Sequence, residues 1–136
     1  MKLAQVKHIP KSVQKALDFI WGNSKPKNYD NICYTYGDTC YINSTTIPKD
    51  LERHEVTHTV QQGDNPDAWW ERYAVDPVFR YEQELEAYRN QYHYVIAWKG
   101  RITAFTYAKF FAQSLSSPMY GNICTYNKAL GDIIKV

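Results

Sequence analysis

Apolar residues recur at helical spacing in several stretches of the chain, and short segments rich in Gly, Pro, Asn and Ser separate these stretches. Val13, Ala16, Leu17 and Ile20 are one example, because residues three or four apart share one face of a helix. The apolar patterns and the stop signals beside them predict helices at Ser12–Trp21, Pro48–Gln62, Asp67–Ala74, Val78–Lys99 and Ile102–Gln113.

A β-hairpin is predicted at residues 31–43, where β-branched and aromatic residues flank Gly37-Asp38. Glycine at the first of two turn positions is typical of a type II′ turn. In this register Cys40 faces Thr35, and Cys33 is only a diagonal neighbour of Cys40. We therefore expect no disulfide between the two cysteines.

The pattern as a whole predicts a mostly helical α+β fold in a single domain over residues 1–136. Residues 25–28 are expected to form a loop. Beyond Pro118 the signal weakens, and we expect a short extended piece at Ile123–Thr125 and a last helical turn.

The composition and the charge of the chain bear on its partners and on the compartment in which it works. The net charge is only +2 and no run of Lys or Arg stands out, which argues against nucleic acid as a partner. The N-terminal residues lack the apolar core of a signal peptide, and no segment is long and apolar enough to cross a membrane. The three cysteines, Cys33, Cys40 and Cys124, are too few and too loosely spaced for a disulfide framework. These observations predict a cytoplasmic protein without a membrane partner.

The segment His54-Glu55-Val56-Thr57-His58 matches HExxH and falls within a predicted helix. Histidines four residues apart lie on one helix face, so both imidazoles can reach one small cation. Glu55 then points to the open side of the ion, where a carboxylate can take a proton from water. The alternative is a coincidence of two surface histidines and a solvated glutamate. We expect a zinc site.

Catalytic zinc takes a third protein ligand and keeps one position open. No histidine follows at the HExxHxxGxxH spacing, but Glu82-Gln83-Glu84-Leu85-Glu86-Ala87-Tyr88 lies on the long predicted helix. Here the chain resembles the gluzincins, thermolysin-like zinc metallopeptidases whose third ligand is a glutamate on a helix downstream of HExxH. The resemblance implies Glu84 as that ligand. Glu82 and Glu86 lie roughly 200° around the helix from Glu84 and are expected to face solvent; if all three only formed a charged face, the site would be incomplete.

The resemblance extends over about residues 32–92. This region is also similar to the minimal gluzincins and to the HExxH domains of bacterial contractile injection systems. It implies a small zincin-like domain in which a β-hairpin or small sheet packs on the HExxH helix and the glutamate helix. It also implies that a hairpin strand forms the upper edge of the cleft, so we expect a free strand edge to which a peptide could add. The flanking regions resemble no family.

One departure from the family concerns the partner that orients a zinc-bound histidine. The gluzincin aspartate that does this corresponds to Tyr88 here. Metal-binding histidines need such a partner to fix their tautomer. Gln61, Gln91, Asp76 or a backbone carbonyl could serve.

The group that stabilises the oxyanion during hydrolysis is not settled by the sequence. Tyr88 and Arg80 lie roughly 40° from Glu84 around the helix, and Tyr73 is an alternative. His93 falls on the opposite face. The aromatic pair Trp69-Trp70 has two interpretations, as core residues or as the lining of a cleft for an apolar side chain.

Together these features predict a zinc-dependent metallopeptidase that hydrolyses a peptide bond in a peptide or protein substrate. His54, His58 and Glu84 would bind Zn²⁺, and the catalytic residues would be Glu55 and Tyr88. The first alternative is a zinc-binding structural or interaction module with a degenerate site, as a component of a phage or secretion particle. A metal-free scaffold ranks last. The substrate and the oligomeric state do not follow from the sequence.

Overall fold

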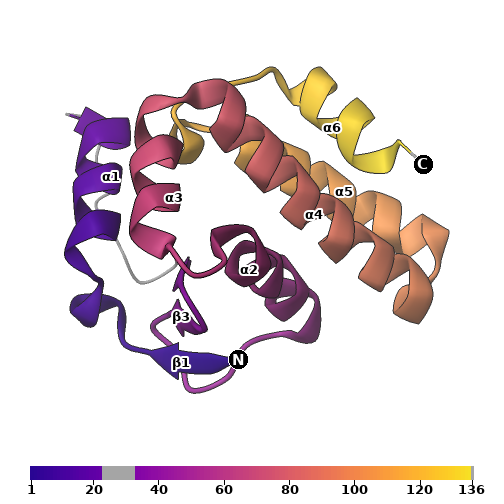
Figure 1. Cartoon of the computed structure of the whole chain (residues 1–136). Helices are drawn as coiled ribbons and strands as arrows, with labels where there is room; N and C mark the ends of the chain where they lie inside the picture. Colours follow the sequence, from indigo (N-terminus) through magenta and orange to yellow (C-terminus); the bar gives the residue numbers. More distant parts are fainter. Residues whose placement is uncertain (23–32, 136) are drawn as a thin grey trace.

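Helices make up most of the protein in the computed structural model, which describes residues 1–22 and 33–135 (Figure 1). The helices in the described part are α1 (Lys11–Trp21), α2 (Lys49–Gln62), α3 (Pro66–Val75), α4 (Pro77–Lys99), α5 (Arg101–Leu115) and α6 (Tyr126–Ile134). The strands are β1 (Lys2–Ala4), β2 (Tyr34–Tyr36) and β3 (Thr39–Tyr41), and two 3₁₀ helices are η1 (Val6–His8) and η4 (Pro118–Tyr120). The predicted mostly helical α+β fold is confirmed.

The five predicted helices are present, each within two residues of its expected ends. Near the C-terminus one prediction is wrong, and the predicted helical turn is present but longer than expected. Residues Ile123–Thr125 form no strand, and the expected last turn is the nine-residue helix α6, whose N-cap is the Thr125 side chain. The predicted loop at 25–28 and the first two positions of the hairpin lie outside the described residues.

The small sheet has the order β1-β3-β2, with β1 parallel to β3 and β2 antiparallel to it. Thr35 pairs with Cys40, as the sequence predicts. Gly37 has a φ of +61° and Asp38 keeps a negative φ, which fits the expected type II′ turn. Strand β1 was not predicted, and it leaves β3 in the centre of the sheet with both edges paired.

Proline and glycine place the two helices that carry the HExxH and glutamate motifs. Helix α2 ends at Gly63, whose φ of +58° suits glycine. Helix α4 begins at Pro77, and the side chain of Asp76 caps it by accepting a hydrogen bond from the Phe79 amide at 3.0 Å. Because the chain turns at these points, α4 returns to pack against α2.

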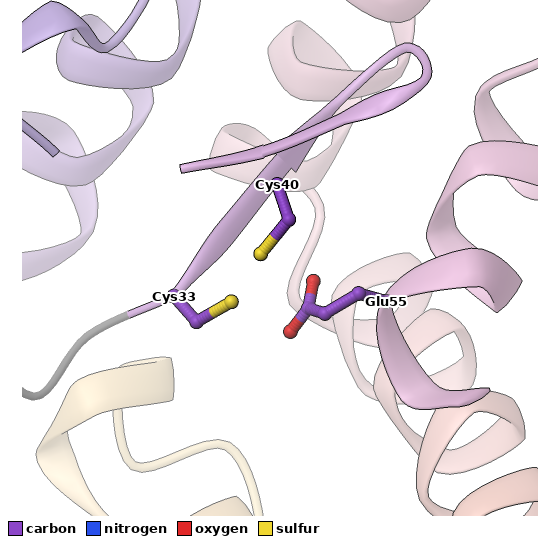
Figure 2. A group of neighbouring side chains, drawn as sticks. All are labelled: Cys33, Cys40 and Glu55. Atoms are coloured by element: carbon purple, nitrogen blue, oxygen red, sulfur yellow. The ribbon is translucent and has the colours of Figure 1, made fainter. Parts of the chain in front are cut away.

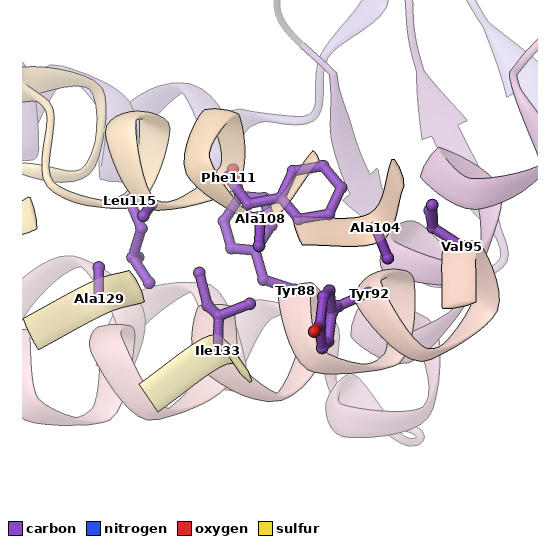
Figure 3. Close-up of a cluster of buried hydrophobic side chains, with 10 residues drawn as sticks. Tyr88, Tyr92, Val95, Ala104, Ala108, Phe111, Leu115, Ala129 and Ile133 are labelled. Carbon is purple, nitrogen blue, oxygen red and sulfur yellow. The ribbon is translucent and has the colours of Figure 1, made fainter. Parts of the chain in front are cut away.

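Two hydrophobic cores meet near these helices. The first joins α1, α3 and β2 through Trp21, Tyr34, Trp69 and Trp70, among others. The second joins α4, α5 and α6 (Figure 3), where fully buried alanines of α5 allow the helices to approach closely.

None of the described helices combines the length and the apolar character needed to cross a bilayer.

The second core yields a stability prediction. Leu115 is fully buried, so Leu115→Ala removes packed methyl groups and leaves a cavity. We expect a loss of about 2–5 kcal/mol in the free energy of unfolding, measured by urea denaturation. Phe110→Ala is the control on the same helix, because Phe110 is 64% exposed and should cost far less. Equal losses in the two variants would contradict this account of the core.

Candidate metal site

Three buried side chains from two helices converge as the sequence predicts. His54 and His58 lie on α2, Glu84 lies on α4, and each is at most 5% exposed. The Nε2 atoms of the two histidines are 3.2 Å apart. They lie 3.2 Å and 3.1 Å from Oε1 of Glu84. The three groups could hold a metal ion.

These distances can be compared with the shell of a zinc ion. Zinc binds imidazole nitrogen and carboxylate oxygen at about 2.0–2.2 Å, so tetrahedral geometry places neighbouring ligand atoms about 3.3–3.5 Å apart. The observed triangle has edges of 3.1–3.2 Å and needs only a small expansion. Three ligands on one side leave a fourth position for water, as in catalytic sites.

A glutamine orients His54. Oε1 of Gln91 lies 3.1 Å from Nδ1 of His54, and the Gln91 amide nitrogen donates to Oδ2 of Asp50 at 2.8 Å. Because the amide nitrogen faces Asp50, its oxygen must accept from Nδ1–H of the imidazole. The proton therefore sits on Nδ1, and Nε2 keeps its lone pair for a metal.

His58 is oriented in the same way by Gln61. Oε1 of Gln61 lies 2.8 Å from Nδ1 of His58. The Gln61 amide nitrogen donates to the Gln83 carbonyl at 2.9 Å and to Glu86 at 3.0 Å. Two of the partners proposed from the sequence, Gln61 and Gln91, are thus confirmed as hydrogen-bond partners of the histidines, whereas Asp76 caps α4 and pairs with Arg72.

Tyr73 completes the surroundings of Glu84. Its hydroxyl donates to Oε2 of Glu84 at 2.7 Å, which leaves Oε1 facing the two histidines. Burial and the nearby Glu84 charge raise the pKa of Tyr73, so the hydroxyl remains a donor. Tyr73 was considered for the oxyanion, but the structure commits its hydrogen to the carboxylate.

Charge within the triad favours ionised Glu84. Burial alone would raise the pKa of the Glu84 carboxyl, but the charges and hydrogen bonds of His58 and His54 outweigh it and hold that pKa well below its usual range. Burial also opposes protonation of His58, yet the Glu84 carboxylate raises the pKa of His58 to about 9. In metal-free protein His58 therefore carries a proton at neutral pH, which a metal ion must displace.

Glu55 is buried between the triad and the hairpin. The hydroxyl of Thr35 on β2 donates to Oε2 of Glu55 at 2.6 Å. The thiols of Cys33 and Cys40 also lie beside the carboxylate (Figure 2). The Thr35 bond fixes one carboxylate oxygen, and the Cys33 thiol also lies within hydrogen-bonding reach of the carboxylate.

Tyr88 packs against the metal site, and its hydroxyl has a partner that sequence analysis missed. The Tyr88 and His54 ring centroids are 4.4 Å apart, and the Tyr88 hydroxyl lies 2.8 Å from that of Tyr120. Burial and the charge of Glu84 raise the pKa of both tyrosines. No local pattern singled out Tyr120, because only the return of η4 brings it to the site.

The other candidates offer no atom to the triad, although Glu86 accepts a hydrogen bond from Gln61. Glu82 and Glu86 are exposed, as predicted, and so is His93. The Arg80 guanidinium is engaged by the carbonyls of Tyr73, Ala74 and Tyr120, so it ties α4 to η4 and α3 instead of facing a substrate.

The expected free strand edge is not found among the described residues. Strand β3 is paired on both sides. On the outer side of β2 the Thr35 carbonyl accepts hydrogen bonds from Gln62 at 2.8 Å and from Trp70 at 3.1 Å. This prediction is wrong because α2 and α3 supply side-chain donors to the edge that a peptide would need.

A cavity of about 340 Å³ lies beside the triad, where the two cores meet. Its lining includes His54, His58, Glu84 and Glu55 together with Tyr88, and it is otherwise largely aromatic and aliphatic. Trp69 and Trp70 take both roles considered for them, since they belong to the first core and also line this cavity.

Comparisons with protein-family models, with curated proteins and with solved structures found no match to this chain.

The triad yields a prediction about metal content. Purified protein should hold about one zinc ion per chain, and His54→Ala, His58→Ala or Glu84→Ala should each lose it, because a three-ligand site rarely survives removal of one ligand. Elemental analysis after dialysis measures this. Glu82→Gln and Glu86→Gln are matched controls on α4 and should keep the ion. Loss of zinc in Glu86→Gln but not in Glu84→Ala would overturn the choice of third ligand.

The His58–Glu84 pair predicts a pH dependence of metal-free protein. The pKa of His58 is about 9 in the folded state and about 6.5 when unfolded. Its stabilising contribution is therefore complete below about pH 6.5 and is lost as the pH rises through about 9. The free energy of unfolding, measured by urea denaturation with a chelator, should fall across this range. In Glu84→Gln the decline should flatten, and an equal decline in both proteins would refute the pairing.

Proposed function

We propose that this protein is a zinc-dependent hydrolase of amide bonds, of the gluzincin type, in which His54, His58 and Glu84 hold the ion. The observation that carries the proposal is the triangle of three buried ligand atoms with Glu55 beside it. Both histidines have glutamine partners that leave Nε2 free, which supports metal binding over an ordinary hydrogen-bonded core.

A bound zinc ion would polarise the substrate carbonyl and lower the pKa of a water molecule toward neutral. Glu55 accepts the proton of the attacking water at Oε1, while Thr35 holds Oε2 in place. The water oxygen bonds to the carbonyl carbon, the carbon–nitrogen bond breaks, and Glu55 returns the proton to the leaving nitrogen. The net change is addition of one water across the amide.

The Tyr88–Tyr120 pair is the best candidate for stabilising the oxyanion. Both residues line the cavity, and their raised pKa values keep their hydroxyls protonated. One of the two tyrosines donates its hydroxyl hydrogen to the other, since the two oxygens are 2.8 Å apart. The hydroxyl hydrogen of the other tyrosine can then be donated to the carbonyl oxygen of the substrate.

The substrate is a peptide or another small amide that inserts a side chain or chain end into the cavity. The volume of about 340 Å³ suits such a group. Addition of an extended peptide to β2 is not part of the proposal, because Gln62 and Trp70 occupy the outward carbonyl of Thr35.

The alternative is a zinc-stabilised structural or interaction module, such as a component of a phage or secretion particle. The covered strand edge and the burial of all three ligands favour it. Glu55 favours the enzyme, since a structural site needs the ligands alone.

We also propose that the protein is cytoplasmic. The three cysteines are free, and Cys33 and Cys40 remain unbridged although their thiols are close to each other. Free thiols at this distance suit a reducing compartment.

The substitution Glu55→Gln separates enzyme from module. It keeps size and polarity but cannot accept a proton at neutral pH, so zinc content and thermal stability should persist while hydrolysis falls at least ~10²-fold. The assay is cleavage of a pool of short fluorogenic peptides by zinc-loaded protein. Glu82→Gln, on the exposed face of α4, is the control and should retain full activity.

The module interpretation is correct if the wild type cleaves no peptide or small amide and Glu55→Gln matches it in every assay of binding and stability.

A further inference from the structure

A second group of metal-binding atoms lies on the hairpin side of Glu55. The thiols of Cys33 and Cys40 and the Glu55 carboxylate all lie within 4.8 Å of one another. Figure 2 shows the three side chains pointing toward one another from β3, from the residue before β2, and from α2. Cys40 is fully buried and Glu55 is 4% exposed, so this is not a surface cluster.

The register of the hairpin brings the two thiols together. Thr35 pairs with Cys40, and Cys33 precedes Thr35 by two residues, so all three side chains share one face of the sheet. That face is turned to α2, where Thr35 donates to Glu55. The backbone geometry therefore holds the donors in place before any ligand arrives.

Glu55 interacts with the charge of His58 only from beyond ion-pair distance. It makes no ion pair with any described residue. A buried carboxylate is costly unless it is paired or well hydrogen-bonded. The hydrogen bond with Cys40, burial and the charge of Glu55 all raise the pKa of the Cys33 thiol, so this thiol is a protonated donor and not a counter-charge. A cation would neutralise this cluster.

We infer that Cys33, Cys40 and Glu55 form a second metal site, which takes a soft cation such as Cd²⁺ or Cu⁺. Two sulfur donors select a soft ion, whereas the His54–His58–Glu84 triad offers nitrogen and oxygen. Binding converts the two thiols to thiolates and releases two protons to solvent, with no change of oxidation state. One carboxylate and two thiolates leave a further position for water.

The site has a consequence that rests on the proposed function. Glu55 belongs to the second site and is also the proposed proton acceptor of the first. A cation on the two thiolates occupies the carboxylate, so Glu55 can no longer accept a proton from water. Occupancy of the second site therefore inhibits hydrolysis without displacing zinc from the triad.

The test adds Cd²⁺ to the zinc-loaded full chain in a phosphine reductant, after thiol counting has shown that Cys33 and Cys40 are reduced. We expect one cadmium per chain in addition to zinc, with a thiolate-to-cadmium charge-transfer band in the ultraviolet. Cys33→Ser and Cys40→Ser should abolish the band, whereas Cys124→Ser should retain it, since Cys124 packs in the second core. Glu55→Gln should weaken cadmium binding at least ~10-fold, because loss of a direct ligand should cost at least as much as loss of a group that hydrogen-bonds to a ligand.

A band that survives in the double variant Cys33→Ser/Cys40→Ser, or no band in the wild type, overturns the site. A double variant His54→Ala/His58→Ala should lose zinc and keep the cadmium band, so the second site can stand even if the proposed function fails. Where the wild type hydrolyses peptide, cadmium should reduce the rate at least ~10²-fold, the loss expected when general-base action is removed. It should leave the rate of the double cysteine variant unchanged. Binding without slowing of hydrolysis would refute the inhibitory role.

Discussion

The structure depends on how three buried ionisable side chains, those of His54, His58 and Glu84, are held next to one another. Glu84 faces the Nε2 atoms of His54 and His58 at 3.2 Å and 3.1 Å. Two unprotonated nitrogens and a carboxylate at these distances repel one another, so one imidazole must carry a proton or a cation must lie between them. In metal-free protein His58 carries this proton, because its pKa is raised to about 9. A bound zinc ion would take the place of the proton.

Much of the neighbouring structure keeps the triad in this arrangement. Gln61 and Gln91 each present an oxygen to a histidine because their nitrogens are committed elsewhere. Tyr73 turns one oxygen of Glu84 away from the histidines, and it comes from α3, which belongs to the first core. Tyr88 belongs to the second core and packs on His54. The site is thus held by both cores, which favours a fixed geometry over a mobile one.

Local signals predicted the helices and the pair of histidines, because their determinants are close in sequence. Glu84 is 26 residues from His58, and it was expected only from the resemblance to a known family. Pro77 and Gly63 limit the helices that carry the motifs, and the four-residue spacing of His54 and His58 places both on one face. Strand β1 was missed because three residues carry no pattern, and its extended form comes from pairing with β3. Tyr120 and the covered edge of β2 were missed because each depends on contacts between distant segments, such as Trp70 with Thr35.

X-ray absorption at the zinc edge tests the central claim most directly, on protein loaded with one equivalent of zinc. If His54, His58 and Glu84 hold the ion, the spectrum will show imidazole scattering with only nitrogen and oxygen neighbours at about 2.0–2.2 Å. Sulfur neighbours at about 2.3 Å without imidazole scattering would place the first ion on Cys33 and Cys40 instead, and would contradict the account.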